Sequence, residues 1–239
     1  MPTNIIPHVP LSPDHPIEVI IGFGADVPAD ADWPDPLDLF ARFVTAGGFV
    51  ESCPQLNWKV TVLPHGLHVT YERLPADPSV LAVLVRMLLA LALPPSTIHV
   101  QGTPAASGAR SLPSTPAALD LVPNVRPQLA FGLEMETGLS WLCIEVSCST
   151  TLDPAAAALV DQRLELWCKV CRAGGLSKVG ADQTVEPGQA GKYEPSVGED
   201  FLAVEIMYGE VAIAAPGALP NLLDELARGG VPISGVSIR

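Results

Sequence analysis

Apolar and polar residues alternate along this chain with two periodicities, one typical of helices and one typical of strands, and each half of the chain contains both. Apolar positions three and four residues apart predict amphipathic helices that start at Asp35-Pro36 and cover residues 80–93, 153–172 and 219–228. Alternation with a period of two predicts strands in the first half at residues 16–22, 57–63, 67–73 and 97–101. The same criterion predicts strands in the second half at residues 128–136, 141–147, 201–208, 210–214 and 233–238.

Two segments of the chain are similar without a gap. Residues 17–48 align with residues 144–175 at a constant offset of 127, and 11 of the 32 paired positions are identical. Both segments begin with Ile-Glu-Val and end with Ala-Gly-Gly. Self-similarity of this kind indicates an internal duplication of one structural unit.

The order of elements predicts an α+β fold. Each half has the β-α-β-β-α-β order of the ferredoxin-like plan, an antiparallel sheet with both helices on one face and the other face open. We expect an irregular N-terminal lead at residues 1–15, a first unit at 16–102, a Pro/Ser/Ala-rich linker at 103–127 and a second unit at 128–239. The second unit is expected to contain one extra strand and a loop insertion at 176–200.

Three expectations concern how these elements pair. Strands 128–136 and 141–147 should form a hairpin around Thr137-Gly138, and strands 201–208 and 210–214 should pair across Gly209. The helix at 80–93 is apolar nearly all round. We therefore expect the other unit, or a second chain, to cover it on more than one side.

Composition and charge exclude several classes of protein. The net charge of −13 does not suit a phosphate backbone, so no nucleic-acid partner is expected. The apolar run at 80–93 is 14 residues long and contains Arg86, which is too short for a membrane span. Residues 1–16 do not resemble a signal peptide, and the five cysteines are an odd number, so we expect a cytoplasmic protein.

Cys168 and Cys171 have the spacing of a redox dithiol or half of a zinc site. The corresponding positions of the first repeat are Ala41 and Val44, which belong to the apolar face of a helix. The cysteines also fall in the last turn of their helix, where the helix dipole disfavours a thiolate. Core packing is therefore the preferred interpretation.

Histidines cluster on the sheet of the first unit. Alternation places His68 and His99 on its open face, and His65 lies in the turn that precedes His68. These three side chains are the candidate metal ligands, or a proton-transfer pair. The expected strand order separates His68 from His99 by one strand, which favours solvated or interface histidines instead.

Carboxylates cluster on the sheet of the second unit. By the same argument its open face carries Glu134, Glu136, Glu145 and Glu205. Such a face suits a cation or a basic protein surface, although a merely solvated face explains it equally well.

No catalytic motif is complete, and no cofactor is expected. Residues 186–193 depart from a phosphate-binding loop, because the motif needs glycine where the chain has Glu186 and serine or threonine where it has Tyr193. The leading hypothesis is a protein-binding or sequestering module, for example an immunity or antidote protein that inhibits a basic partner. The alternative is a small-molecule or metal-dependent enzyme with its site in the cleft between the units, and homo-oligomers are also left open.

Overall fold

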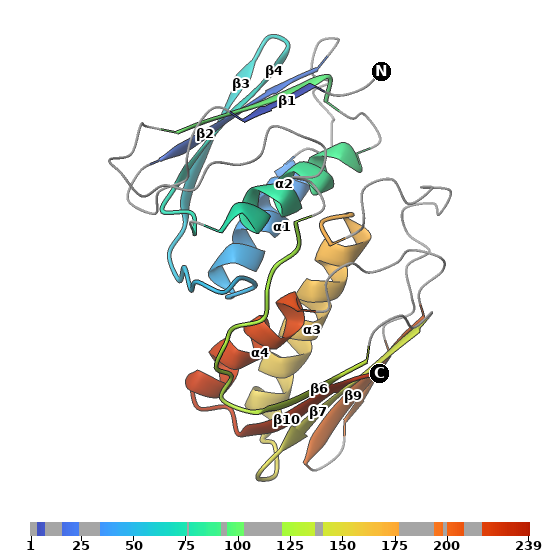
Figure 1. Cartoon of the computed structure of the whole chain (residues 1–239). Coiled ribbons are helices and arrows are strands. Elements are labelled where there is room, and N and C mark those ends of the chain that lie inside the picture. Colours follow the sequence, from blue (N-terminus) through green and yellow to red (C-terminus); the bar gives the residue numbers. More distant parts are fainter. Residues whose placement is uncertain are drawn as a thin grey trace.

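The helices of the chain form two central layers, and a β-sheet covers each of them from outside (Figure 1). The computed structural model describes residues 4–7, 16–23, 34–75, 77–91, 95–102, 121–136, 141–176, 194–197, 200–207 and 217–239. None of the described helices is long and apolar enough to cross a membrane.

The first unit is an α+β sandwich of one sheet and two helices. Its elements are β1 (Asn4–Pro7), β2 (Ile17–Gly22), α1 (Pro34–Thr45), β3 (Asn57–Leu63), β4 (Gly66–Glu72), α2 (Pro78–Leu89) and β5 (Thr97–Gly102). The sheet order is β1-β5-β2-β4-β3. All neighbours are antiparallel except β1, which pairs with β5 in parallel.

The second unit repeats this arrangement. Its elements are β6 (Gly132–Met135), β7 (Trp141–Cys148), α3 (Pro154–Arg172), β8 (Glu194–Val197), β9 (Phe201–Met207), α4 (Ala218–Arg228) and β10 (Ile233–Ile238). The sheet order is β6-β10-β7-β9-β8, and β6 pairs with β10 in parallel. The α+β class is therefore confirmed, and both sheets contain the strand order of the ferredoxin-like plan.

The N-terminal prediction was wrong for residues 4–7, which form β1 instead of an irregular lead. This edge strand has only four residues and a terminal proline, so alternation is too short to reveal it. Within the described residues both sheets thus have five strands, so the second unit shows no strand more than the first. The other residues of the expected lead, 1–3 and 8–15, lie outside the described ranges.

The predicted hairpin at 128–136 and 141–147 was also wrong. β6 and β7 lie on opposite sides of β10 and do not pair with each other. Proximity along the sequence suggested the hairpin, but the parallel position beside β10 needs no tight turn. The expected turn residues lie outside the described ranges.

The second predicted hairpin had the wrong partner. β9 pairs with β8, a strand inside the predicted loop insertion at 176–200, and residues 210–214 lie outside the described ranges. A four-residue strand that contains Pro195 gives little alternation to recognise. The expected insertion is therefore not a loop throughout, since residues 194–197 form a strand. Its first residue, Leu176, is buried in the core.

Aspartate residues cap the first turn of two of the helices. Asp77 Oδ1 accepts a hydrogen bond from the Ser79 amide, and Asp153 Oδ1 accepts one from the Ala156 amide, each at 2.8 Å. A proline follows each aspartate, where the missing amide hydrogen is not needed. α1 begins at Pro34, slightly before the predicted Asp35-Pro36 start.

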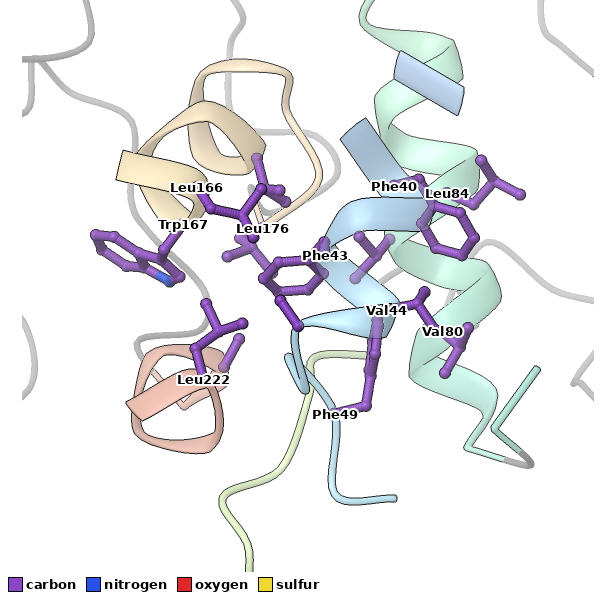
Figure 2. Close-up of a cluster of buried hydrophobic side chains, with 14 of the residues drawn as sticks. Phe40, Phe43, Val44, Phe49, Val80, Leu84, Leu166, Trp167, Leu176 and Leu222 are labelled. Carbon is purple, nitrogen blue, oxygen red and sulfur yellow. The ribbon is translucent and has the colours of Figure 1, made fainter. Parts of the chain in front are cut away.

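One hydrophobic core extends through both units (Figure 2). Phe40 and Val44 of α1 lie beside Leu84 and Val80 of α2, whereas Phe43 points the other way, toward Leu176. On the other side lie side chains of α3 and α4, of which Trp167 and Leu222 are fully buried. The two helix layers therefore share an apolar interface, and the units pack as one body.

Helix α2 is covered on more than one side, as its apolar sequence predicted. Every residue from Ser79 to Leu88 is buried, although Arg86 carries a charge. The Arg86 guanidinium reaches across to the second unit, where Nε donates to the Gly175 carbonyl at 2.8 Å. Its Nη1 donates to the Leu121 carbonyl at 2.9 Å.

The repeated Ala-Gly-Gly sequence lies at the contact between the units. Gly47 has a φ of +89° and Gly174 a φ of +76°, a conformation in which a side chain would be strained. A Cβ atom on Gly174 would lie 2.9 Å from Ala90 Cβ at the end of α2. A Cβ atom on Gly47 would overlap the side chain of Glu225 in α4. The sequence repeat thus marks two places where the backbone of one unit closely approaches the other.

Candidate functional site

The outward face of the second sheet carries the predicted glutamates. Ile144 and Val146 of β7 are buried against the helices, so Glu145 between them points outward and is exposed. Strand register aligns Glu134 of β6 and Glu145 of β7 on either side of Ser237. Neighbouring strands are about 4.8 Å apart, so these carboxylates share one face across three strands.

A second row of acids follows on the same face. Glu136 is exposed just beyond β6, and its amide donates to the Ile238 carbonyl at 2.8 Å. Register places Glu205 opposite Cys143 on one side and opposite Glu194 on the other. The sequence had not indicated Glu194, because its strand was not predicted.

Arg239 is a basic side chain beside this face. Its Nη2 lies 3.9 Å from Glu134 Oε2, and the two side chains are 62% and 82% exposed. An ion pair so long and so solvated contributes little to stability. The carboxylates therefore remain available to a partner.

The outward face of the first sheet carries the predicted histidines. Register places both His68 and His99 opposite Ile20, so one strand separates them, at a spacing of about 10 Å. His68 Nε2 lies 3.5 Å from Glu18 Oε2. His65 is exposed in the turn between β3 and β4. Within the described residues, no group of three His, Cys, Asp or Glu side chains is placed to hold a metal ion.

The histidine face and the glutamate face point away from each other. Four helices lie between the two sheets, so the faces are on opposite outer surfaces (Figure 1). The structure therefore does not bring His68 and His99 together with the glutamates of the second unit. A cleft between the units that joins them, as the enzyme hypothesis expected, is absent from the described part of the chain.

Cys168 is a core residue, 3% exposed in α3. Burial raises the pKa of its thiol to about 12, so the thiol is protonated at neutral pH. Cys148 is buried beneath the sheet, whereas Cys143 belongs to the opposite, outward face. This arrangement does not suit a four-cysteine zinc site.

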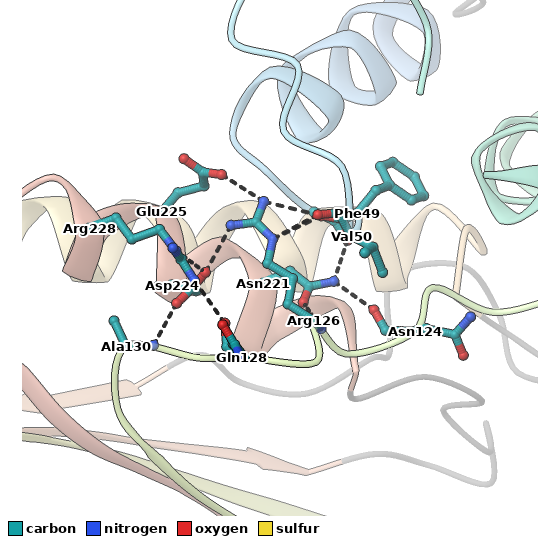
Figure 3. A network of polar contacts seen from close by, with 11 residues as sticks. Phe49, Val50, Asn124, Arg126, Gln128, Ala130, Asn221, Asp224, Glu225 and Arg228 are labelled. Atoms are coloured by element: carbon teal, nitrogen blue, oxygen red, sulfur yellow. Dashed lines mark hydrogen bonds and ion pairs between the residues drawn. The ribbon is translucent and has the colours of Figure 1, made fainter. Parts of the chain in front are cut away.

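A buried polar network joins the units around Arg126 (Figure 3). The Arg126 Nη1 atom lies 2.9 Å from Asp224 Oδ2, and Nη2 lies 2.6 Å from Glu225 Oε1. Its Nε also donates to the Phe49 and Val50 carbonyls, just beyond α1, at 3.3 and 3.1 Å. One side chain therefore connects α4 of the second unit to the chain that follows α1 of the first.

Asp224 is the acceptor at the centre of the network. It receives hydrogen bonds from Arg228 Nε at 2.7 Å and from the Ala130 amide at 2.8 Å, in addition to Arg126. Burial alone would raise the pKa of Asp224, but the bonds from Arg228, Ala130 and Arg126 outweigh it and hold the pKa below its ordinary value. This network is structural, because its polar atoms are directed at one another.

The network corrects the prediction for the linker at 103–127. Residues 121–127 are described, and Arg126 is 8% exposed. The Arg126 amide also donates to Asn221 Oδ1 at 2.9 Å. This part of the chain is packed between the units. Residues 103–120 lie outside the described ranges.

Two cavities flank the contact between α1 and α3, and we call them the basic pocket and the mixed pocket. The basic pocket has a volume of about 350 Å³ and is lined by Thr45, Ala46, Gln162, Arg163, Glu165 and Leu166. The mixed pocket, of about 500 Å³, is lined by Arg172, Ala173, Asp35, Pro36, Asp38 and Leu39. Arg42 and Lys169 line both.

The two linings correspond in part, because Pro54 of the basic pocket and Met87, Ala90 and Leu91 of the mixed pocket have no counterpart. The six residues given above for the basic pocket align, in the same order, with the six given for the mixed pocket at the repeat offset of 127 residues. Thr45, for example, aligns with Arg172, and Gln162 aligns with Asp35. The same shift exchanges Arg42 and Lys169. The α1 and α3 helices therefore cross antiparallel about a pseudo-two-fold axis, with one pocket on each side.

Comparisons with known proteins give no family. No protein-family model matches the chain, and no curated protein matches it. A mutant chlorite dismutase from Candidatus Nitrospira defluvii is 11% identical, covers 89% of this chain and 82% of its own, and has a TM-score of 0.20. The same enzyme in complex with imidazole has the same values.

A Cas6 product complex is also 11% identical, with coverage of 94% of this chain and 99% of its own. Its TM-score is 0.19. Scores this low carry no argument about fold or function, so the function must be argued from the residues themselves.

Sequence reasoning missed Arg126 and Arg163, which lie at the contact between the units. A signal for the pockets was nevertheless present, since the strongest part of the repeat, residues 37–42 and 164–169, forms their walls. The relative placement of the two units was needed to interpret it.

Proposed function

We propose that the chain is a cytoplasmic binding module that captures a basic protein on the glutamate face of its second sheet. The observation that carries this proposal is the alignment of Glu134 with Glu145 on one exposed surface. Glu136 extends the same surface, and the register adds the position of Glu205.

Charge complementarity supports a basic partner. Carboxylates that face each other on a sheet repel, and Arg239 offsets only part of that repulsion. Lysine and arginine side chains of a partner would relieve it and would replace water with charge-assisted hydrogen bonds. The net charge of −13 would also speed the encounter with a basic protein.

We also propose that the two units arose by duplication of one ferredoxin-like ancestor. The gap-free repeat, the matching sheet orders and the corresponding pocket linings support it. The full set of glutamates would then be a property of one copy, because the equivalent face of the first sheet keeps Glu18, the counterpart of Glu145, but also carries His68 and His99.

The experiment is affinity capture from the host lysate with the tagged full chain, followed by mass spectrometry. Glu134→Lys combined with Glu145→Lys should abolish the capture of a stoichiometric basic protein. The matched control is Glu18→Lys with Glu72→Lys, which changes the net charge equally on the opposite face.

Loss of capture in the first double variant alone would support the glutamate face. Equal loss in both would show that only net charge matters, and retained capture in both would remove the proposal. Capture should also weaken as salt rises, since exposed charges are screened.

A further inference from the structure

The basic pocket stands out in an acidic protein because of its charge. Arg42, Arg163 and Lys169 line it, and Glu165 is the acid among its lining residues. Lys169 Nζ lies 3.0 Å from Glu165 Oε1, so these two charges largely offset each other. Two guanidinium groups are left without a carboxylate in the pocket.

We propose that the basic pocket binds the phosphate group of a small phosphorylated molecule. The side chains of Arg42 and Arg163 form no hydrogen bond or ion pair with any other described residue. Their two positive charges match a phosphate monoester, which is close to a dianion at neutral pH. Arginine forks also suit the tetrahedral oxygen geometry of phosphate.

Arg163 is the strongest single indication. Its Nε atom is buried and has no hydrogen-bond partner among the described residues. Native structures seldom leave a buried donor unsatisfied, so such an atom calls for an explanation. The nearby Glu225 does not provide one, because its carboxylate is already 2.6 Å from Arg126 Nη2. Burial also lowers the pKa of Arg163, and Glu225 offsets this effect only in part. An anionic ligand would satisfy the guanidinium.

The size of the pocket limits the ligand. A volume of about 350 Å³ lies at the lower end of the range for small-molecule sites and is too small for a folded partner. Ala46 and Leu166 provide apolar contacts for the carbon skeleton of the ligand. The Gln162 side chain is positioned to distinguish polar substituents.

The mixed pocket is an internal control. At the positions equivalent to Gln162 and Glu165 it has Asp35 and Asp38, and Pro36 takes the place of Arg163. Arg172 gives the mixed pocket a second arginine beside Arg42, but this pocket has two carboxylates where the basic pocket has one, which disfavours a phosphate dianion. We therefore expect one phosphate site per chain.

Calorimetric titration of the full chain at low salt tests the proposal, with inorganic phosphate and glycerol 3-phosphate as probes. We expect saturable binding of both, with one site per chain. Arg163→Gln should weaken it by at least about tenfold, the loss of one charged hydrogen bond. Arg172→Gln, the same change in the mixed pocket, should alter it less than about twofold.

Succinate, a dicarboxylate, tests whether the pocket selects phosphate over another dianion. We expect succinate to bind at least about tenfold more weakly than phosphate. Thermal unfolding checks that each variant folds. If Arg163→Gln does not fold, Arg42→Gln makes the same test at an exposed position. No saturable phosphate binding up to about 10 mM, equal loss in Arg163→Gln and Arg172→Gln, or equal binding of succinate would each overturn the proposal.

Discussion

Arg126 and Arg163 of this protein have opposite surroundings. Arg126 contacts two carboxylates and several backbone carbonyls, whereas Arg163 has an unsatisfied Nε atom. A buried charge is tolerable when its partners are in place and costly when they are not. The first arginine is therefore suited to holding the fold together, and the second to holding a ligand.

Asp224→Asn should lower the free energy of unfolding by about 3 kcal/mol, because it removes the fully buried partner of Arg126 and Arg228. Urea denaturation at pH 7 measures this change. Glu225→Gln is the matched control, since Glu225 is 28% exposed and its loss should be below about 1 kcal/mol. A larger loss for Glu225→Gln would place the main anchor of Arg126 elsewhere.

The Asp224 carboxylate also makes the free energy of unfolding depend on pH. Because the folded pKa of Asp224 is below its ordinary value, its contribution is fully present above about pH 4 and is lost as the pH falls further. The unfolding free energy of the native chain should therefore decline below that pH. In Asp224→Asn this part of the decline should be missing, as a pH series of urea titrations would show.

Arg163→Met should raise the free energy of unfolding in the absence of ligand by roughly 1 kcal/mol, because a desolvated charge is replaced by an apolar chain of similar length. Arg172→Met in the mixed pocket should change it by less than about 0.5 kcal/mol. Loss of stability in Arg163→Met would mean that the guanidinium is already satisfied in the free protein.

At the scale of elements, the Ala-Gly-Gly sequence has two functions. It ends α1 and α3, where the Gly48 amide donates to the Phe43 carbonyl and the Gly175 amide to the Val170 carbonyl. It also lets the other unit approach closely, since Ala90 and Glu225 occupy the space of the missing side chains. Helix termination and unit packing thus depend on the same glycines.

Gly174→Ala should destabilise the chain by about 2 kcal/mol or more, from strain at positive φ and from contact with Ala90 Cβ. Ala90→Gly in the same chain should recover the steric part and leave the strain. A double-mutant cycle in urea measures the coupling between the two sites. Strict additivity would show that the close approach to Ala90 costs nothing.

Periodicity located the long elements well, as the apolar faces of α1 and α3 and the alternation of β2 and β4 illustrate. Periodicity also indicated β6, within the predicted strand 128–136, although the expected hairpin partner was wrong. It failed for β1 and β8, which have four residues each. Such strands gain their stability from the neighbouring strand, and their own pattern is too short to be recognised. The basic pocket was missed for a related reason, since Arg42 and Arg163 come together only when the helices cross.

At the scale of the whole molecule, the shared helix layers predict one cooperative unfolding transition. Circular dichroism and tryptophan fluorescence should give the same midpoint in urea, because one core contains side chains of both units. Arg126→Ala should lower that midpoint and separate the two signals. Arg239→Ala, at an exposed position, should do neither.

The crossing of α1 and α3 also bears on stoichiometry. Two identical subunits around a true two-fold axis present identical pockets, so the two pockets have the same intrinsic affinity for a ligand. A single chain is free of this constraint, and here Arg163 and Pro36 occupy positions that symmetry would have forced to be the same. Because the two units are linked in one chain, their two pockets can differ, so that the basic pocket binds a ligand and the mixed pocket does not.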